Sequence, residues 1–271
     1  MNRRIKSIII VLLTLGIIIS IIFFGIFAQD NLLKVNFTSK NLSPSIDHPF
    51  GTDWLGRDML IRTLKGLSTS IIIGLSAALV SAIMAVIIGS LAGTMPKWVD
   101  NLIIWLIDLM MGIPHIVLLI LISFVMGRGL KGIFVGIALT HWPSLARLIR
   151  GEVLQLRNEF YIETSKKLGK SNLYILRYHI IPHIFPQFIV GLILLFSHAI
   201  LHEAAITFLG FGLSPEQPAV GIILSESMKY LSIGMWWLAF FPGLSLVAIV
   251  LLFYKLGDNL KRLLDPYSAQ E

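Results

Sequence analysis

The chain has 271 residues, of which 56% are hydrophobic and 14% are charged, a balance typical of proteins embedded in a membrane. Its formal net charge of +7 comes from basic residues that flank apolar segments instead of forming a stripe beside aromatic residues, which excludes nucleic acid as a partner. The absence of cysteine excludes disulfides, thiolate metal sites and cysteine nucleophiles.

Six apolar segments are long enough, or nearly so, to cross a bilayer core of about 30 Å as helices. They cover residues 8–28, 70–94, 101–126, 131–147, 184–211 and 235–256. The first segment follows a basic start but has a longer apolar run than a cleaved signal peptide, and we interpret it as an uncleaved anchor. The predicted fold class is therefore all-α, a polytopic membrane protein with six transmembrane helices.

The segment between the first two spans is too polar to cross a membrane. In its element GTDWLGRD, turn glycines alternate with three charged residues, Asp53, Arg57 and Asp58. These residues are expected either to form a local salt-bridge network or to contact a solute-binding protein. Residues 1–69 are assigned to an N-terminal transmembrane anchor followed by an extracytoplasmic loop.

Small residues and prolines within the spans predict how the helices meet. Glycines one helical turn apart allow close helix packing. The pairs are Gly89 with Gly93 in the second span and Gly132 with Gly136 in the fourth. A proline inside a helix removes an amide donor and bends the helix or opens a cavity beside it. Pro114 and Pro143 are expected to do so in the third and fourth spans.

Ionisable side chains inside a membrane are candidates for function, because burying a charge there costs about 2.5 to 3.5 kcal/mol on insertion scales. The predicted spans contain Asp108, His115, His141, His198, His202 and Glu203. The candidate substrate path consists of Asp108, His141, His198, His202 and Glu203. The structural alternative is that the two carboxylates only pair with a histidine or with a partner subunit.

Two of these histidines, His198 and His202, lie four residues apart, which places them on one face of a helix. Imidazole is a suitable ligand for nickel, cobalt, copper or zinc. The pair is therefore a candidate for a weak, transient metal site that passes an ion on. The alternative is that both side chains only form hydrogen bonds between helices.

The polar segment 152–182 lies between the fourth and fifth spans. With both termini in the cytoplasm, the inner segments hold 14 of the 22 Lys and Arg residues, which agrees with the positive-inside rule and places this segment in the cytoplasm. Apolar residues recur at helical spacing on both sides of Gly169, which predicts two short amphipathic helices broken at that glycine. The pattern fits either a docking element or an interfacial helix that anchors loops.

The same segment contains Gly169-Lys170-Ser171, the last residues of a phosphate-binding loop pattern. Thr164 stands where that pattern needs a glycine, and no buried strand precedes it. An H-E-x-x-H motif is absent and no Ser-His-Asp arrangement is visible. The chain is therefore predicted not to be an enzyme and to bind no cofactor of its own.

The stretch ETSKKLG, followed nine residues later by HIIP, resembles the EAA loop of ABC importer permeases, which forms a coupling helix that inserts into a separate ATPase subunit. By this resemblance, Glu163 is the Glu of the loop and Gly169 is its glycine. Thr164 and Ser165 take the places of two alanines, and these substitutions keep the side chains small.

Three further stretches resemble the dipeptide, oligopeptide and nickel class of these permeases, specifically the C-type subunit. They are HPFGTDWLGRDMLIR, EAAITFLGFGLSPEQPAVG and FPGLSLVAIVLLFYKLGDNLKRLLDP. Together with the EAA-like loop they extend the resemblance over residues 48–266. Two departures are visible: PAVG lacks the tryptophan common before this glycine, and Tyr254-Lys255 stand where the family usually has Phe-Asn.

The resemblance implies a permease domain over residues 70–257, a cytoplasmic tail over 258–271 and ATP-driven alternating access in the cytoplasmic membrane. The implied partners are a B-type permease subunit, two ATPase subunits that use the ATP, and an extracytoplasmic solute-binding protein. Nickel-type members also have a histidine before a tryptophan, as in THW at 140–142, and a His-x-x-x-His pair ahead of the FLG turn. This favours nickel, free or chelated, over short peptides as the cargo.

Two other classes of protein remain open. An ion-coupled secondary transporter could use Asp108 and Glu203 as proton sites, although no inverted repeat is detectable and the coupling segment would have no role. A structural membrane anchor for another complex would not need carboxylates inside the membrane.

Overall fold

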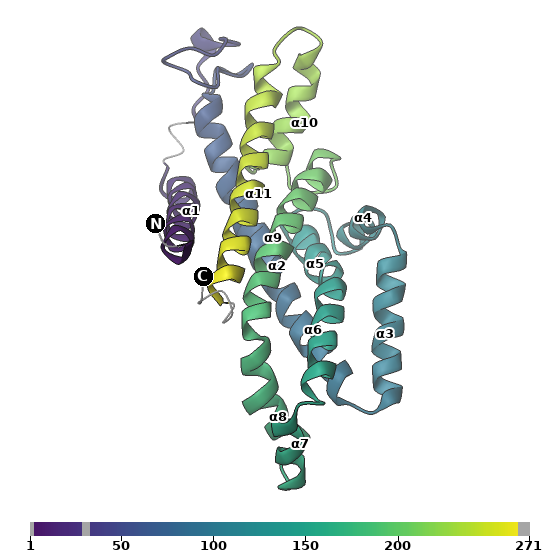
Figure 1. The fold of residues 1–271 in the computed structure, drawn as a ribbon. Coiled ribbons are helices and arrows are strands. Elements are labelled where there is room, and N and C mark those ends of the chain that lie inside the picture. Colours follow the sequence, from purple (N-terminus) through teal and green to yellow (C-terminus); the bar gives the residue numbers. More distant parts are fainter. Residues whose placement is uncertain (1–2, 29–32, 265–271) are drawn as a thin grey trace.

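The computed structural model describes residues 3–28 and 33–264, and this part of the chain is helical (Figure 1). Apart from one β-bridge between Thr52 and Asp58, the described residues form no β structure. The helices are α1 (Arg3–Phe27), α2 (Met59–Thr94), α3 (Lys97–Gly112), α4 (His115–Val125), α5 (Leu130–Thr140), α6 (Trp142–Leu156), α7 (Phe160–Lys167), α8 (Asn172–Ile175), α9 (Ile181–Phe208), α10 (Val220–Leu231) and α11 (Trp237–Leu264). The predicted all-α class is confirmed.

Five helical segments among the described residues are long and apolar enough to cross a membrane: α1, α2, α5 with α6, α8 with α9, and α11. A sixth span is present only if α3 and α4, which are bent by 96° relative to each other, count as one. The bend expected at Pro114 in the predicted span 101–126 is therefore present, and it divides this span into two helices. Pro114 has no amide hydrogen to continue α3, and it holds Ile113 in an extended conformation.

The second span begins earlier than predicted. The side chain of Asp58 accepts hydrogen bonds from the amides of Leu60 (2.9 Å) and Ile61 (3.1 Å), so it caps α2 at Met59. The boundary predicted between residues 69 and 70 thus lies inside one continuous helix. The charged outer loop is connected directly to the membrane-spanning part of α2.

The fourth and sixth spans also extend further than the apolar pattern indicates. α6 continues past Arg147 because its arginines find partners on α3: Arg147 pairs with Asp108, and Arg150 donates to Asp100 over 2.5 and 2.7 Å. α11 runs to Leu264, into the segment assigned to a tail, and residues 265–271 lie outside the described residues.

The core of the bundle forms around α2, which packs against α1, α6 and α9. A Cβ atom at Gly89 would lie 2.5 Å from the carbonyl oxygen of Ala146, and one at Gly93 would lie 2.5 Å from Cγ1 of Val153. The predicted close packing at this glycine pair is confirmed, and α6 is the partner helix. α2 and α6 can approach this closely only while both positions lack a side chain.

We expect Gly89→Ala to lower the stability of the chain by about 1 to 3 kcal/mol, as overpacking does in a closely packed core. The added methyl group would meet the carbonyl oxygen of Ala146, which belongs to the backbone of α6 and cannot rotate away. Thermal unfolding of the purified chain in lipid nanodiscs measures the effect. Gly151→Ala is the matched control, because a Cβ there meets nothing within 4 Å. Equal unfolding temperatures for both variants would contradict the packing explanation.

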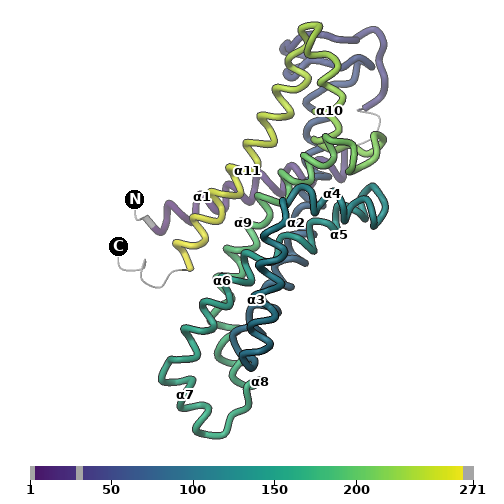
Figure 2. The backbone as a smooth tube through the Cα atoms, turned by 90° about the vertical axis from the view of Figure 1, so that its right-hand side faces the viewer, coloured from purple at the N-terminus to yellow at the C-terminus, as the bar shows by residue number. Residues whose placement is uncertain are grey.

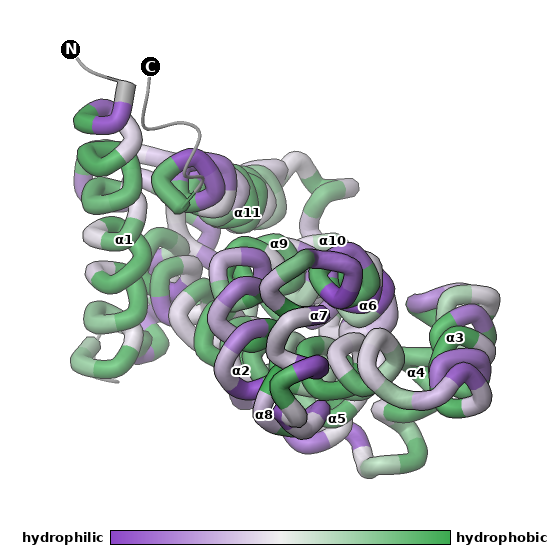
Figure 3. Tube along the Cα trace, turned by 60° about the horizontal axis from the view of Figure 1, so that its bottom comes forward, coloured by the Kyte–Doolittle hydropathy of each residue, from purple (hydrophilic) through white to green (hydrophobic). Residues whose placement is uncertain are grey.

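The two ends of the bundle carry different elements. The outer loop and α10 lie at one end, and α7 with α8 lies at the other (Figure 1 and Figure 2). α1 lies to the side, against α2 and α11, and is hydrophobic along most of its length (Figure 3). Leu12 and Leu13 of α1 are 64% and 63% exposed, so this helix presents an apolar face suited to lipid.

Candidate translocation cavity and coupling segment

A cavity of about 480 Å³ opens where the helices are interrupted. Its wall is formed by the end of α3, the start of α4, the junction of α5 with α6 and the middle of α9. Thr140, Ser144 and three methionine or leucine side chains line it together with histidines, but none of its lining residues is Asp, Glu, Lys or Arg. The cavity wall therefore combines apolar side chains with hydroxyls and imidazoles and carries no fixed charge.

Three histidines of this wall lie against one another. His115 begins α4, His141 lies between α5 and α6, and His202 lies in α9. The ring centroids of His115 are 4.5 Å from those of both His141 and His202, and the latter two are 5.2 Å apart. One ring nitrogen from each residue lies within 4.8 Å of the other two. The two helix breaks thus bring together residues that are far apart in the sequence.

Hydrogen bonds to backbone carbonyls orient two of these rings. Nδ1 of His141 lies 3.0 Å from the carbonyl oxygen of Ile137, and Nδ1 of His202 lies 2.9 Å from that of His198. A carbonyl oxygen can only accept, so we assign the proton to Nδ1 in both rings. Each neutral ring then has its lone pair on Nε2, and the lone pair of His141 faces the protonated Nδ1 of His202 at 3.4 Å and can accept from it.

The predicted pair of His198 and His202 is not the group of histidines that the structure brings together. His198 also lines the cavity, but its ring is exposed and its carbonyl oxygen serves to orient His202. The third histidine of the group is His115, which the predicted substrate path did not include. The position of His115 directly after Pro114 could have indicated that it lines the cavity, since a proline in a membrane helix marks a break at which side chains can face a cavity.

The two predicted carboxylates lie away from the cavity. Asp108 is 59% exposed in its side chain and pairs with Arg147. Glu203 is fully buried, and its Oε1 accepts a hydrogen bond from Oγ1 of Thr207 (3.0 Å), which in turn accepts one from the amide of Leu213 (3.4 Å). Glu203 therefore holds the turn that follows α9. Both carboxylates thus have partners within this chain, Arg147 and Thr207, and neither of these is the histidine or the partner subunit that the structural alternative named.

The coupling segment, residues 152–182, has the predicted break. Gly169 has a φ of +77°, in the left-handed region that favours glycine, and it separates α7 from α8. A π-helical turn, Leu176–Ile180, leads from α8 into α9. Ile162 of α7 is fully buried, while Phe160 and Leu168 are 80% and 73% exposed. The prediction of two short helices broken at Gly169 is confirmed, and the segment projects apolar side chains outward.

Three of the candidate coupling residues lie on α7, where Glu163 is exposed and Thr164 and Ser165 are half-buried. Glu163 is exposed and lines a hollow of about 570 Å³ together with Arg157, Asn158 and two lysines. The hydroxyls of Thr164 and Ser165 donate to the carbonyls of Phe160 and Tyr161 over 2.8 and 2.9 Å. Oγ of Ser165 also lies 3.3 Å from Nε2 of His179, so this side chain connects α7 to the turn that leads into α9.

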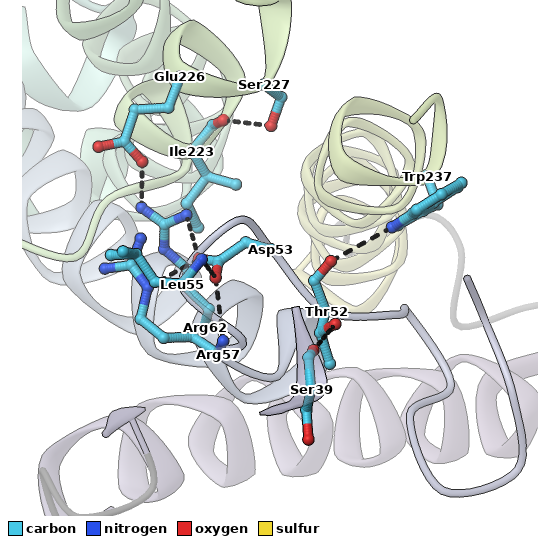
Figure 4. Close-up of polar contacts among 10 residues, drawn as sticks. All are labelled: Ser39, Thr52, Asp53, Leu55, Arg57, Arg62, Ile223, Glu226, Ser227 and Trp237. Carbon is cyan, nitrogen blue, oxygen red and sulfur yellow. Dashed lines mark hydrogen bonds and ion pairs between the residues drawn. The ribbon is translucent and has the colours of Figure 1, made fainter. Parts of the chain in front are cut away.

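The outer loop is held to α10 by a network of ion pairs (Figure 4). Asp53 is fully buried and accepts hydrogen bonds from Nε of Arg57 (2.7 Å) and Nη1 of Arg62 (3.2 Å). Arg62 also pairs with Glu226 of α10. Asp58 accepts from the ring of His48 (2.7 Å) besides capping α2. Of the two expectations for this loop, the local salt-bridge network is present.

Residues 85–268 match the family model described as "Binding-protein-dependent transport system inner membrane component", and this range covers more than half of the chain. The chain belongs to this family. The permease is therefore a multi-pass protein of the inner membrane and a membrane subunit of an ABC importer, and such a subunit is not itself an enzyme.

Relatives of the permease have names that refer to peptides. It is 35% identical over 236 residues to the dipeptide transport system permease protein DppC of Bacillus subtilis, covering 87% of this chain and 74% of that one. It is 34% identical over 250 residues to the oligopeptide transport system permease protein OppC of the same species, covering 92% and 82%.

A solved structure shares the fold. A chain from inward-facing conformations of the methionine ABC transporter MetNI superimposes with a TM-score of 0.64 at 17% identity, covering 75% of the permease and 96% of that chain. The predicted architecture of an importer permease is thus confirmed at the level of the fold.

Proposed function

We propose that the permease is one of two membrane subunits of an ATP-driven importer that moves short peptides into the cell by alternating access. The observation that carries this proposal is that one chain combines a cavity at the helix breaks, lined by hydroxyls, imidazoles and apolar side chains, with an exposed coupling segment at the end of the bundle. The chain has no phosphate-binding loop, so the work must come from ATPase subunits that bind this segment.

Short peptides suit the cavity. A zwitterionic peptide carries opposite charges and many hydrogen-bonding groups but little net charge, and the wall offers hydroxyls, imidazoles and helix ends without a fixed charge. The printed names of DppC and OppC point to the same class of cargo. A B-type permease would supply the other wall of the path. An extracytoplasmic solute-binding protein would deliver the peptide at the end where the outer loop and α10 lie.

The proposed orientation has α7, α8 and both termini in the cytoplasm. It agrees with the excess of Lys and Arg in the inner segments. On α3, Trp98 and Trp105 are 70% and 59% exposed, which provides an apolar face for lipid or for the B-type subunit. No cofactor is assigned to this chain, and ATP belongs to the ATPase subunits.

Nickel, free or chelated, is the second candidate cargo. The observation that favours it is the histidine trio in the cavity wall, since three imidazoles are suitable ligands for this ion. An ion-coupled secondary transporter is less well supported, because neither Asp108 nor Glu203 lines the cavity.

Uptake by the complete importer in proteoliposomes tests the proposal. With the binding protein outside and ATP inside, we expect accumulation of a labelled dipeptide or tripeptide that stops when ATP is replaced by a non-hydrolysable analogue. Peptide uptake driven by a proton gradient without ATP would overturn the mechanism. Nickel uptake from the ion or from a histidine chelate, with no peptide uptake, would replace the first cargo by the second.

A further inference from the structure

We propose that His115, His141 and His202 form a binding site for a single divalent transition-metal ion. Their ring nitrogens lie within 4.8 Å of one another at the wall of the cavity. Metal-bound imidazole nitrogens lie about 2.0 to 2.1 Å from the ion, so the three rings need to move inward by a small amount to share one. The elements that carry them, α4, the α5–α6 junction and α9, pack against one another.

The surroundings of the trio favour a metal ion over simple packing. Nδ1 of His141 and Nδ1 of His202 donate to the carbonyls of Ile137 and His198. Such hydrogen bonds orient metal-binding histidines, because they fix the ring and place the lone pair on Nε2. Nε2 of His141 lies 3.4 Å from Nδ1 of His202, so an ion would replace this contact between the two rings. His141 is buried and the other two are half-buried, so the ion would be held within the wall and not at the protein surface.

The ligand set defines the class of ion. Three neutral imidazoles and no carboxylate favour borderline ions such as Ni²⁺, Co²⁺, Cu²⁺ and Zn²⁺ over Mg²⁺ or Ca²⁺, which prefer oxygen ligands. A site with three protein ligands that faces a cavity also leaves a coordination position open for water or for a donor atom of a solute.

Binding would also join the two helix breaks. His115 lies directly after the bend between α3 and α4, and His141 lies at the junction between α5 and α6. An ion shared with His202 of α9 would fix these three elements relative to one another. The conformation with the ion bound is therefore expected to be more stable than the metal-free one.

Metal titration of the purified chain in nanodiscs tests the site without any transport step. We expect one Co²⁺ per chain, with the visible absorption of a low-coordinate cobalt site, and competition by Ni²⁺ and Zn²⁺ but not by Mg²⁺. Single substitutions His115→Ala, His141→Ala and His202→Ala should each weaken binding at least about tenfold, as loss of a ligand does. His183→Ala, on the exposed start of α9 outside the cavity, should leave binding unchanged.

Two results would overturn the proposal. One is unchanged Co²⁺ binding in all three variants of the trio. The other is loss of binding in His198→Ala with binding retained in His115→Ala, which would assign the metal to the pair within α9. Where an alanine variant fails to fold, the Gln variant at the same position and the unfolding temperature of the metal-free protein separate misfolding from loss of a ligand.

The inference rests on the proposed function only in placing the trio on the solute path, and the two can fail separately. Peptide uptake by the complete importer in the presence of a chelator depends on the function and not on the metal. If uptake proceeds while Co²⁺ titration shows no site, the metal proposal fails alone. If Co²⁺ binds as described while no solute is taken up, the proposed function fails alone.

Discussion

Replacing Glu163 with alanine and Gly169 with valine is expected to lower solute uptake sharply while the ATPase subunits continue to hydrolyse ATP. Glu163 is exposed beside Arg157 and Lys167 in the hollow of the coupling segment, where a partner could pair with it. A valine at Gly169 is strained at a φ of +77°, by roughly 1 to 2 kcal/mol. A coupling energy of 1 to 3 kcal/mol corresponds to about a 5-fold to 150-fold loss of uptake per ATP hydrolysed.

The measurement is uptake and phosphate release in the same proteoliposomes, so that their ratio reports coupling directly. Glu159→Gln is the control, because Glu159 is an exposed glutamate four residues away that does not line the hollow. The amount of assembled complex must be equal in all samples. Normal uptake with both Glu163 and Gly169 replaced would remove the coupling role from this segment.

Replacing Asp53 with alanine is expected to cause the largest loss of stability of any single change in the outer loop. Asp53 accepts from Arg57, from Arg62 and from the amides of Leu55 and Arg57, both at 2.9 Å. Its loss leaves Arg62, which is 7% exposed in its side chain, with Glu226 as the remaining acidic partner. Breaking a buried ion pair typically costs about 3 to 5 kcal/mol, which corresponds to a fall of about 10 °C in unfolding temperature.

Thermal unfolding and limited proteolysis of the loop both report this change. Asp53→Asn should be milder than Asp53→Ala, because the amide oxygen can still accept from the two backbone amides. Asp47→Asn is the matched control in the same loop, since Asp47 is exposed and such substitutions usually change stability by less than about 0.5 kcal/mol. An unfolding temperature for Asp53→Ala equal to that of Asp47→Asn would mean that the network does not hold the loop to α10.

The features that the sequence predicted are those with a local physical cause. The apolar spans follow from the thickness of the bilayer, and the break at Gly169 follows from the freedom of glycine at positive φ. The size of the bend after α3, 96°, could not be predicted, because the angle depends on how α4 packs against α5. Pro114 indicated a bend but not its size.

The histidine group in the cavity wall could not be predicted either, because it depends on tertiary packing. The spacing of His198 and His202 is visible within one helix, so the sequence pointed to that pair. The contact of His115 with His141 and His202 joins three separate elements, and only the tertiary packing of α4, α5 and α9 creates it. The pairing of Asp108 with Arg147 was missed for the same reason, since a carboxylate in an apolar run looks buried until its neighbouring helix is placed.

On the proposed function, the break at Pro114 would also supply weak partners for the two charged ends of a peptide in the cavity. Gly112, at the end of α3, and His115, at the start of α4, both belong to the cavity wall. The last carbonyls of one helix and the first amides of the next carry partial charges of opposite sign. A molecule with an ammonium group and a carboxylate group would find a weak partner for each. Neither partial charge would bind the molecule tightly. The backbone at the ends of α3 and α4 would therefore supply a binding surface from which the transported molecule can dissociate.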